Sequence, residues 1–379
     1  MLALYASVGN ELTHYDVDVA GAALTRRASV ELPANVQYVW PHATQPFLYA
    51  ATSDSASGMG PAGTNHHVSA LKIDRATGAL SLHGAPIKLP TRPIHMATDI
   101  PSEHVLVAFN NPSAIRIYRI NKDGTPGAEV AQPAGIDPGI FAHQVRATPD
   151  NKQVILVTRG HDPAGPKPEE PGALKLFDFK DGVLSNKQSV APNNGYGFGP
   201  RHLDFHPSKP WVYVSQEREN RLDMFTLEGG RLSPEAAFKK NNLSRTVPPG
   251  ARQAVGTVHV HPSGKFVYVA NRASTMIEGA FAGGENTLAA YAIDPDTGEP
   301  NPIQHTDTRG IHCRTFHIDP SGKLLVAAHI QGIRLRDGSE VPCCLSLFRI
   351  GDDGKLDYVR KYDIDVGDKT MWWMGMVEV

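Results

Sequence analysis

Short runs of alternating apolar and polar residues, each followed by a turn that contains glycine, recur along the chain. Seven glycine turns follow strand-like runs such as Leu174–Phe179 and Leu288–Asp294. The turns are spaced 46 to 68 residues apart. This spacing, with strands on both sides of each turn, is typical of a propeller, because one blade is too thin to bury its own faces. The glycines are Gly21, Gly78, Gly124, Gly182, Gly230, Gly298 and Gly354.

A second repeated feature is a proline that closes an alternating strand and precedes another strand. The best copies are Val258–Ala270 and Phe316–Ala327, where a Pro-Ser-Gly turn predicts a hairpin. Six prolines accompany the seven glycines, and pairing of Met371–Val379 with Leu2–Val8 in one blade explains the deficit. We therefore predict an all-β, seven-bladed β-propeller, closed by its terminal strands, as a single domain over 1–379. The prolines are Pro41, Pro101, Pro149, Pro207, Pro262 and Pro320.

The composition agrees with this fold and limits the partners. The 379 residues include 35 glycines and 30 prolines, together about 17% of the chain against a usual ~12%, as a turn-rich all-β protein requires. The net charge is −2, which gives no general attraction to nucleic acid or to an anionic membrane. We expect a small-molecule partner, and the sequence does not indicate an oligomeric state.

The cysteines and the N-terminus suggest a location. Three cysteines, of which Cys343 and Cys344 are adjacent, argue against a disulfide framework. The N-terminal apolar run lacks a basic start and is too short for a signal peptide, and no segment approaches the ~20 apolar residues that span a bilayer. We expect the protein in a reducing cytoplasm.

Hairpin symmetry predicts which side chains meet at the central channel. Positions six before and ten after each proline should lie opposite each other at one end of the two inner strands. Packing alone would favour Val, Ile or Leu at such places, but four arginines, two histidines and a glutamate stand there. Six before are Asn35, His95, His143, Arg201, Gly256 and Arg314, and ten after are Asn111, Arg159, Glu217, Arg272 and Ile330.

The strongest group is Arg201 with Glu217 in one blade, flanked by His143 and Arg272 from the neighbouring blades. Several arginines against one glutamate favour an anionic ligand. A histidine of ordinary pKa exchanges a proton near neutral pH, and an arginine stabilises an oxyanion. These parts suit hydrolysis or formation of a lactone. No Gly-x-Ser-x-Gly elbow occurs, and one channel carboxylate is too few for a metal site, so we expect neither a metal nor a cofactor.

One stretch carries a specific resemblance. Gly197–Pro207 followed by Val212–Glu217 resembles the hallmark of the seven-bladed lactonase family, which contains propeller-type 6-phosphogluconolactonases and fungal-type carboxymuconate lactonising enzymes. The likeness continues in 143–150, 266–272 and 314–323 and covers essentially the whole chain. It implies a metal-independent enzyme with a catalytic His, Arg, Glu and Arg. These fall on the four residues that the spacing also selects, His143, Arg201, Glu217 and Arg272.

The expected activity is hydrolysis of an anionic sugar lactone, such as 6-phosphogluconolactone or a related aldonolactone. His143 or Glu217 would activate water, Arg201 would stabilise the oxyanion, and Arg272 with Arg314 would hold the substrate's anionic group. The other expected substrate-binding residues are His95, Arg159 and His202.

Two alternatives remain open on the sequence. Within the same fold, a cycloisomerase would form a lactone from a muconate. In another class, a non-catalytic propeller would bind proteins through exposed apolar residues on its rim, but the chain has no Trp-Asp repeat signature. The loops Asp54–Asn65 and His161–Gly172 are expected to be surface excursions that cover one face of the ring.

Overall fold

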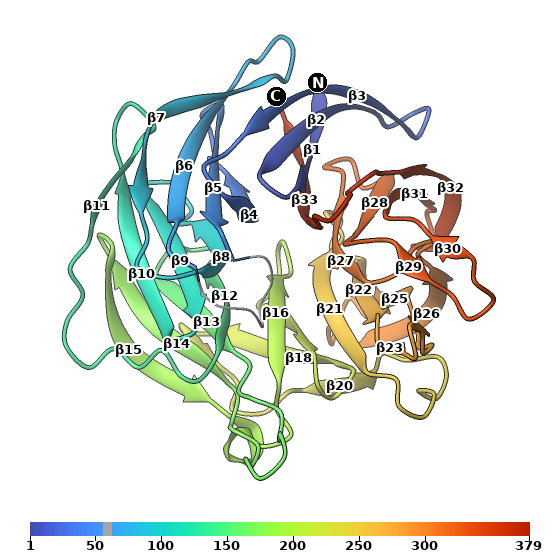
Figure 1. The fold of residues 1–379 in the computed structure, drawn as a ribbon. Helices are drawn as coiled ribbons and strands as arrows, with labels where there is room; N and C mark the ends of the chain where they lie inside the picture. The colour runs from blue at the N-terminus through green and yellow to red at the C-terminus, as the bar shows by residue number, and fades with distance from the viewer. Residues whose placement is uncertain (56–62) are drawn as a thin grey trace.

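The computed structural model describes residues 1–55 and 63–379. Within these residues seven antiparallel sheets surround a central axis (Figure 1). We number these sheets as blades 1 to 7 in chain order. One short 3₁₀ turn, η1 (Pro192–Gly195), is the helical element of the described chain. The all-β propeller predicted from the repeats is therefore confirmed.

Each blade is a sheet whose strands follow one another from the channel outward. Blade 1 contains, from its innermost strand, β33 (Met371–Glu378), β1 (Leu2–Val8), β2 (Glu11–Asp18) and β3 (Ala23–Glu31). Blade 2 contains β4 (Asn35–Pro41), β5 (Phe47–Ser53), β6 (His66–Ile73) and β7 (Leu80–Lys88) in the same order. Blade 3 contains β8 (Pro93–Thr98), β9 (His104–Asn110), β10 (Ser113–Ile120) and β11 (Pro126–Glu129). Blade 4 contains β12 (Ala142–Ala147), β13 (Gln153–Thr158), β14 (Ala173–Lys180) and β15 (Val183–Val190).

The remaining blades carry short additions. Blade 5 contains β16 (Pro200–Phe205), β17 (Trp211–Gln216) and β18 (Arg221–Glu228), with β19 (Arg231–Leu232) and β20 (Phe238–Asn241) both paired to β18. Blade 6 contains β21 (Gln253–Val260), β22 (Phe266–Ala273), β25 (Thr287–Ile293) and β26 (Pro300–Asp307). Blade 7 contains β27 (Cys313–Ile318), β28 (Leu324–His329), β31 (Cys344–Ile350) and β32 (Leu356–Asp363). Two separate hairpins are β23 (Met276–Ile277) with β24 (Ala280–Phe281), and β29 (Ile333–Arg334) with β30 (Glu340–Val341).

The ring closes through its termini, as the sequence predicted. Strand β33 pairs antiparallel with β1, so that Ala3 lies opposite Val377 and Leu4 opposite Met376. The amide of Val379 donates to the carbonyl of Met1 at 2.9 Å. Both ends of the chain therefore lie side by side on blade 1 (Figure 1). This pairing covers the inner edge of β1 and supplies the innermost strand of blade 1.

The core lies between the blades. Seven apolar clusters fill the seven interfaces between neighbouring blades of the described chain. The second strands are buried on both faces, and β9, β13 and β28 are buried along their whole lengths. Their continuous apolar runs follow from this burial, because each such strand packs against a blade on either side.

The predicted glycine turns also join neighbouring blades. The hydroxyl of Tyr213 in β17 donates to the carbonyl of Gly298 in the next blade at 2.8 Å. Tyr5, Tyr49 and Tyr268 make the equivalent bond to Gly78, Gly124 and Gly354. A Cβ on Gly124 would lie 2.3 Å from the Phe47 ring, and its φ is +84°, so this turn requires glycine.

Histidines before the proline turns make similar links. The Nε2 atom of His206 bonds the carbonyl of Gly264 at 2.9 Å, and that of His261 bonds the carbonyl of Gly322 at 2.8 Å. Both are structural contacts with the next blade. His66 and His67 begin β6 and are buried.

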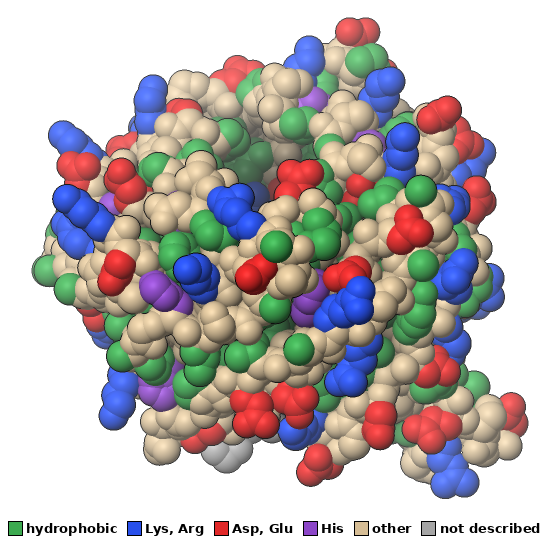
Figure 2. Space-filling model, turned by 90° about the horizontal axis from the view of Figure 1, so that it is seen from above, with side chains coloured by type: hydrophobic (Ala, Val, Ile, Leu, Met, Phe, Trp, Pro, Cys, Tyr) green, Lys and Arg blue, Asp and Glu red, His purple; other side chains and the backbone are tan. Residues whose placement is uncertain are grey.

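The face of the molecule drawn in Figure 2 shows no dominant charge. Lys and Arg side chains are interspersed with Asp and Glu on the face drawn in Figure 2. No helix formed by the described residues is long and apolar enough to cross a membrane. Of the predicted loop Asp54–Asn65, residues 56–62 lie outside the described part of the chain.

Candidate active site

A β-bulge at one end of the inner strands presents the candidate site residues. In blade 4, Ala142 pairs with Thr158 and Gln144 with Val157, which leaves His143 as the extra residue. Arg201 and Arg314 occupy the same place in blades 5 and 7. The spacing predicted the correct strand end for these residues. It wrongly placed each of them directly opposite a residue of the adjacent strand. Because a bulge re-aims its side chain, these residues face the channel rather than a neighbouring strand.

A cavity of about 880 Å³ opens at this end of the channel. Its lining includes all four predicted catalytic residues, His143, Arg201, Glu217 and Arg272. Arg159 and Arg314, predicted to bind substrate, line it as well. The structure thus brings together six of the eight predicted site residues around a space that suits a small molecule.

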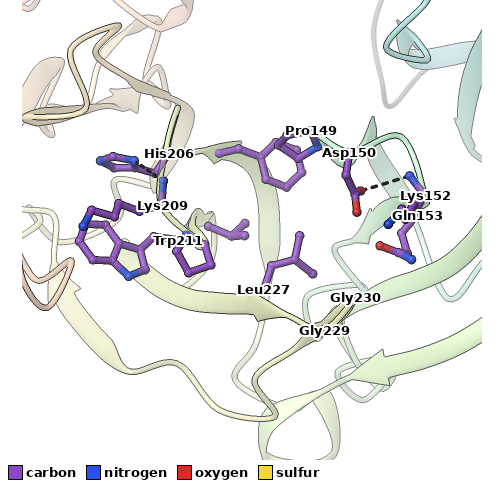
Figure 3. Close-up of a pocket in the computed structure, with 13 residues that line it drawn as sticks. Pro149, Asp150, Lys152, Gln153, His206, Lys209, Trp211, Leu227, Gly229 and Gly230 are labelled. Carbon is purple, nitrogen blue, oxygen red and sulfur yellow. Dashed lines mark hydrogen bonds between the residues drawn. The ribbon is translucent and has the colours of Figure 1, made fainter.

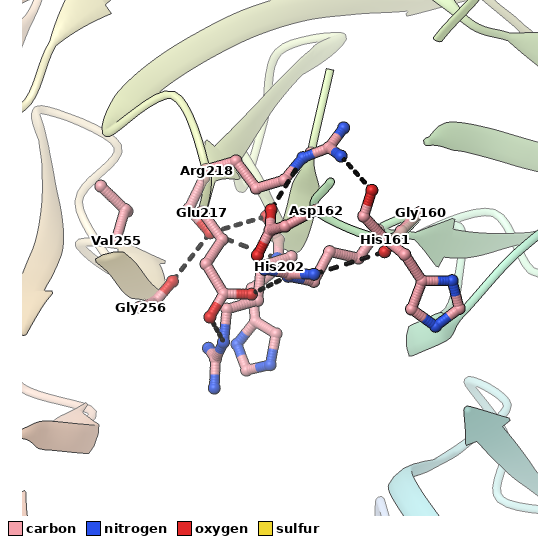
Figure 4. Close-up of polar contacts among 12 residues, drawn as sticks. Gly160, His161, Asp162, His202, Glu217, Arg218, Val255 and Gly256 are labelled. Atoms are coloured by element: carbon pink, nitrogen blue, oxygen red, sulfur yellow. Dashed lines mark hydrogen bonds and ion pairs between the residues drawn. The ribbon is translucent and has the colours of Figure 1, made fainter. Parts of the chain in front are cut away.

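Glu217 is the centre of the polar contacts in this cavity (Figure 4). It follows β17, and its Oε2 atom accepts a hydrogen bond from Arg159 Nε at 2.5 Å. Its Oε1 atom accepts from Arg272 Nη2 and lies 3.9 Å from Arg201 Nε. One carboxylate therefore faces three guanidinium groups, and the site has an excess of positive charge.

The arginines determine the ionisation of Glu217. Burial acts to raise the pKa of this carboxyl, but Arg272, Arg159 and Arg201 together hold the pKa far below its ordinary value. Glu217 is therefore ionised throughout the neutral range. As a base it is weak, because protonation would break its pairing with the arginines.

Arg201 has donors without partners. Its side chain is 1% exposed, and its Nε and Nη1 atoms lack hydrogen-bond partners among the described residues. Burial and the charge of Arg272 lower the pKa of Arg201 to about 9. The guanidinium still carries its charge at neutral pH. Unpartnered buried donors are costly, and at a cavity wall they indicate a place for a ligand oxygen.

His143 combines burial with an available nitrogen. Its Nδ1 atom lacks a hydrogen-bond partner in the described chain. Burial, followed by the charge of Arg201, lowers the pKa of His143 well below the ordinary value of 6.5. An ordinary histidine pKa was expected from the sequence, and the structure corrects this expectation. His143 is neutral at pH 7 and is available as a proton acceptor.

His95 and His202, which the sequence predicts to bind substrate, lie behind the wall of the cavity. Neither of these described side chains lines the cavity, and they are only 0% and 3% exposed. Their rings lie 5.7 Å apart, and the His202 ring is 5.3 Å from that of His143. Tyr38 covers His95 at 4.0 Å. Both histidines therefore pack behind the cavity wall, because the extra residue of the bulge is Arg201 in blade 5 and Ile94 in blade 3.

His312 lines the cavity and was not predicted from the sequence. Its Nε2 atom lies 3.2 Å from Arg272 Nη1, and its Nδ1 atom lies 2.8 Å from the hydroxyl of Ser274. Since arginine can only donate, Nε2 accepts and Nδ1–H donates to Ser274. His312 has a left-handed φ of +58°, and Phe141, at the matching position in blade 4, has a φ of +57°. Including the position eight before each proline in the repeat would have found both.

The loop after β13 forms one wall of the cavity, as expected for His161–Gly172. Its Asp162 carboxylate pairs with Arg159 and Arg252, each at 2.7 Å, and lies 3.7 Å from Arg218 (Figure 4). Arg218 also pairs with Glu169 of the loop at 2.9 Å. Arginines from blades 4, 5 and 6 thus hold this loop against the channel mouth.

Two other features lie away from this centre. Asp99, Glu103 and His104 are close enough to share an ion, but Asp99 already accepts the amides of Glu103 and His104 in the turn after β8. A second cavity, of about 430 Å³, lies between blades 4 and 5 near Gln153 and Trp211 (Figure 3). It contains none of the predicted site residues.

Comparison with known proteins decides the family. Residues 2–335 match the family model described as lactonase, seven-bladed β-propeller. The chain belongs to this lactonase family. Among curated relatives of the lactonase, a 6-phosphogluconolactonase of Bacillus subtilis is 26% identical over 337 residues, with 86% of each chain covered. One of Klebsiella pneumoniae is 26% identical over 357 residues, covering 93% of this lactonase and 92% of the relative.

Solved structures share the fold of this lactonase. A Bacteroides uniformis protein, described as a candidate 6-phosphogluconolactonase, superposes with a TM-score of 0.73 at 21% identity over 99% of both chains. The periplasmic gluconolactonase of Pseudomonas aeruginosa gives a TM-score of 0.68 at 16% identity, covering 100% of this chain and 99% of the other.

Proposed function

We propose that this lactonase hydrolyses an anionic sugar lactone without a metal ion. The observation that carries the proposal is that two Arg201 donors, Nε and Nη1, make no hydrogen bond within the described chain, at a cavity that also presents a neutral His143. The curated relatives named as 6-phosphogluconolactonases support a lactone of an aldonic acid, phosphorylated or not. The excess of arginine over carboxylate supports a negatively charged substrate.

The proposed reaction begins with the lactone carbonyl directed at Arg201. His143 accepts a proton from water as the water oxygen attacks the carbonyl carbon. Arg201 then stabilises the tetrahedral oxyanion. The bond from this carbon to the ring oxygen breaks, and His143 returns the proton to that oxygen. The product is a hydroxy acid, whose carboxyl group then ionises and releases one proton to the solvent. The resulting carboxylate stays beside the arginines.

The roles of Glu217 and Arg272 follow from their contacts. The sequence left His143 and Glu217 as alternative bases. The low pKa of Glu217 and its arginine partners favour His143 as the base and Glu217 as the group that positions the arginines. Arg272 is also engaged, because Nη2 bonds Glu217 and Nη1 bonds His312. We assign it to this reacting centre rather than to a remote part of the substrate.

The compartment and partners belong to the same proposal. Cys313, Cys343 and Cys344 are buried free thiols, which supports a reducing compartment such as the cytoplasm. The concave arginine-rich cavity supports a small-molecule partner rather than nucleic acid or a membrane.

Proton release tests the proposal directly. Purified protein is mixed with freshly prepared gluconolactones in a weak buffer with a pH indicator, before and after prolonged chelation. Acid release above the spontaneous rate that survives chelation is the expected result. Loss with chelator and recovery with a divalent ion would contradict metal independence. Silence with every lactone and loss of muconate absorbance would instead identify a cycloisomerase, and silence in both assays a non-catalytic platform.

A further inference from the structure

A second cationic region lies in the channel apart from Glu217. The Arg314 guanidinium stacks on the Trp372 indole, 3.5 Å from the ring centroid, and its Nε donates to the Trp372 carbonyl at 3.2 Å. The Arg92 guanidinium lies 5.8 Å from the same centroid. These residues come from blades 7, 1 and the start of blade 3. We call Arg92, Arg314 and Trp372 the distal subsite.

The charges of the distal subsite are uncompensated. Neither Arg92 nor Arg314 pairs with a carboxylate among the described residues, although they are only 4% and 8% exposed. Arg92 Nε bonds the side-chain oxygen of Gln37 at 2.8 Å, while its Nη2 has no partner in the described chain. The indole Nε1 of Trp372 also lacks one there. Two buried cations and two unpartnered donors are unfavourable unless an anion is bound.

Two further observations separate this region from the reacting centre. Arg159, Arg201 and Arg272 share the carboxylate of Glu217 as an ion-pair partner, whereas the distal subsite has none among the described residues. Arg314 and Trp372 both line the cavity. The Arg92 guanidinium lies over the Trp372 indole, on which Arg314 also stacks. The stack fixes the plane of the Arg314 guanidinium and leaves its two terminal nitrogens without a protein partner in the described chain.

We propose that the distal subsite binds a second anionic group of the lactone, a phosphate or carboxylate remote from the ester that meets Arg201. This inference rests on the proposed hydrolysis. Arg314 would donate to the anion directly, and Arg92 would add charge and hold the indole. The subsite would make this lactonase select charged over uncharged lactones, because a neutral substituent would leave both cations buried without a counter-charge.

Substrate discrimination tests the subsite. The kcat/KM values of the parent, Arg92→Met and Arg92→Lys are compared on glucono-δ-lactone, its 6-phosphate and its C6-carboxylate analogue. The expected result is that Arg92→Met lowers the preference for charged over uncharged lactone about tenfold, and that Arg92→Lys restores most of it. The phosphate and carboxylate lactones show which anion the subsite favours. An equal change on all three lactones would overturn the proposal.

Two controls distinguish this failure from failure of the hydrolysis. Lys209 lies 5.7 Å over Trp211 in the second cavity (Figure 3), so Lys209→Met should leave the preference unchanged. If no lactone is hydrolysed, the proposed function fails. Binding at the subsite can still be measured by adding inorganic phosphate and following the tryptophan fluorescence. The fluorescence change should be lost in Trp372→Phe and weakened in Arg92→Met. No such signal, or the same signal in both variants as in the parent, would overturn the subsite.

Thermal unfolding distinguishes a ligand-binding arginine from a structural one, because loss of a structural arginine would lower the Tm. Removing an uncompensated buried charge in Arg92→Met should leave the Tm unchanged or raise it, and added phosphate should raise the Tm of the parent more than that of the variant. A lower Tm without phosphate, together with unchanged lactone preference, would assign Arg92 to the fold and overturn the proposal.

Discussion

Buried polar groups at the two ends of the two inner strands of each blade differ in whether they find hydrogen-bond partners. At the turn end, polar side chains find partners in the next blade, as when Tyr213 bonds Gly298 and His206 bonds Gly264. At the channel end, His143 and Arg201 keep polar atoms without partners in the described chain. Both ends belong to the same strands, so the fold alone does not require this difference.

Polar groups at the turn end contribute to stability, whereas those at the channel end serve the proposed chemistry. The tyrosine hydrogen bonds at the turn end join neighbouring blades and recur at four interfaces of the described chain. The channel-end groups vary from blade to blade, and their burial is unfavourable until a ligand supplies oxygen atoms. Loss of a turn-end group should therefore lower stability and spare activity, and loss of a channel-end group should do the reverse.

The largest expected effect is at Arg201. Arg201→Met keeps most of the side-chain volume but removes the donors that face the lactone oxygen. Turnover should fall by about 10²–10³-fold, the usual loss for an oxyanion donor. The free energy of unfolding should be unchanged or higher, since the variant no longer buries a charge with unpartnered donors. Steady-state kinetics and urea unfolding measure the two quantities. A variant that loses stability but keeps its turnover would reverse the comparison of the two strand ends.

The second effect concerns pH. Because the pKa of His143 lies well below 6.5, its neutral form predominates at pH 7, and the rate should stay level through neutrality. It should then fall about tenfold per pH unit below the folded pKa. His143→Ala should lose this acid limb together with most of the activity. If Glu217→Gln removes the acid limb and His143→Ala retains it, the glutamate is the base.

The same shifts affect stability. Burial lowers the pKa values of His95, His143, His202 and His312, so the unfolded chain binds protons more readily near pH 6. These groups stabilise the folded protein above about pH 6.5. The stabilisation is lost as the pH falls from there toward the pKa values of the folded state. Urea unfolding between pH 7.5 and 5.5 measures this loss, which the double variant His95→Gln, His202→Gln should reduce.

The sequence predicted the turns and the closure of the ring, but it missed the β-bulge, although the bulge recurs in blades 4, 5 and 7. The glycine turns and terminal pairing follow from a pattern that each blade repeats, and the structure contains both. Spacing also located His143, Arg201 and Glu217 at one strand end. It could not anticipate the bulge, because an extra residue leaves the count from the proline unchanged. In blade 3 the extra residue is Ile94, which lines the cavity, so His95 is one residue too far along and packs behind the wall, beside His202.

A smaller effect is expected where the loop meets the channel mouth. Asp162→Asn weakens the pairing with Arg159, Arg218 and Arg252 that holds the loop. KM should rise about two- to fivefold with little change in kcat, the size that one partly exposed ion pair contributes. Glu235→Gln, which removes an exposed pair with Lys239, should change neither parameter. A large fall in kcat for Asp162→Asn would place the loop in the chemistry instead of at the entrance.

The smallest expected effect is at the turn end. Tyr213→Phe removes only the hydroxyl that bonds the Gly298 carbonyl, and the ring stays packed among Leu222, Val258 and Tyr291. The free energy of unfolding should fall by about 0.5–1.5 kcal/mol, because a buried carbonyl loses its side-chain donor. Urea unfolding measures this change, and kcat/KM should stay within about twofold, since a hydrogen bond between turns does not reach the channel.

The repeat supplies its own replicates for this last prediction. Tyr5→Phe, Tyr49→Phe and Tyr268→Phe remove the equivalent hydrogen bonds in other blades and should lower the unfolding free energy by similar amounts. Tyr196→Phe is the matched control, because Tyr196 is 47% exposed and its removal should have no measurable effect. If one of the four buried variants lost activity without losing stability, the turn end would also carry chemistry. The division between the two ends would then fail for that blade, since a purely structural bond acts on unfolding alone.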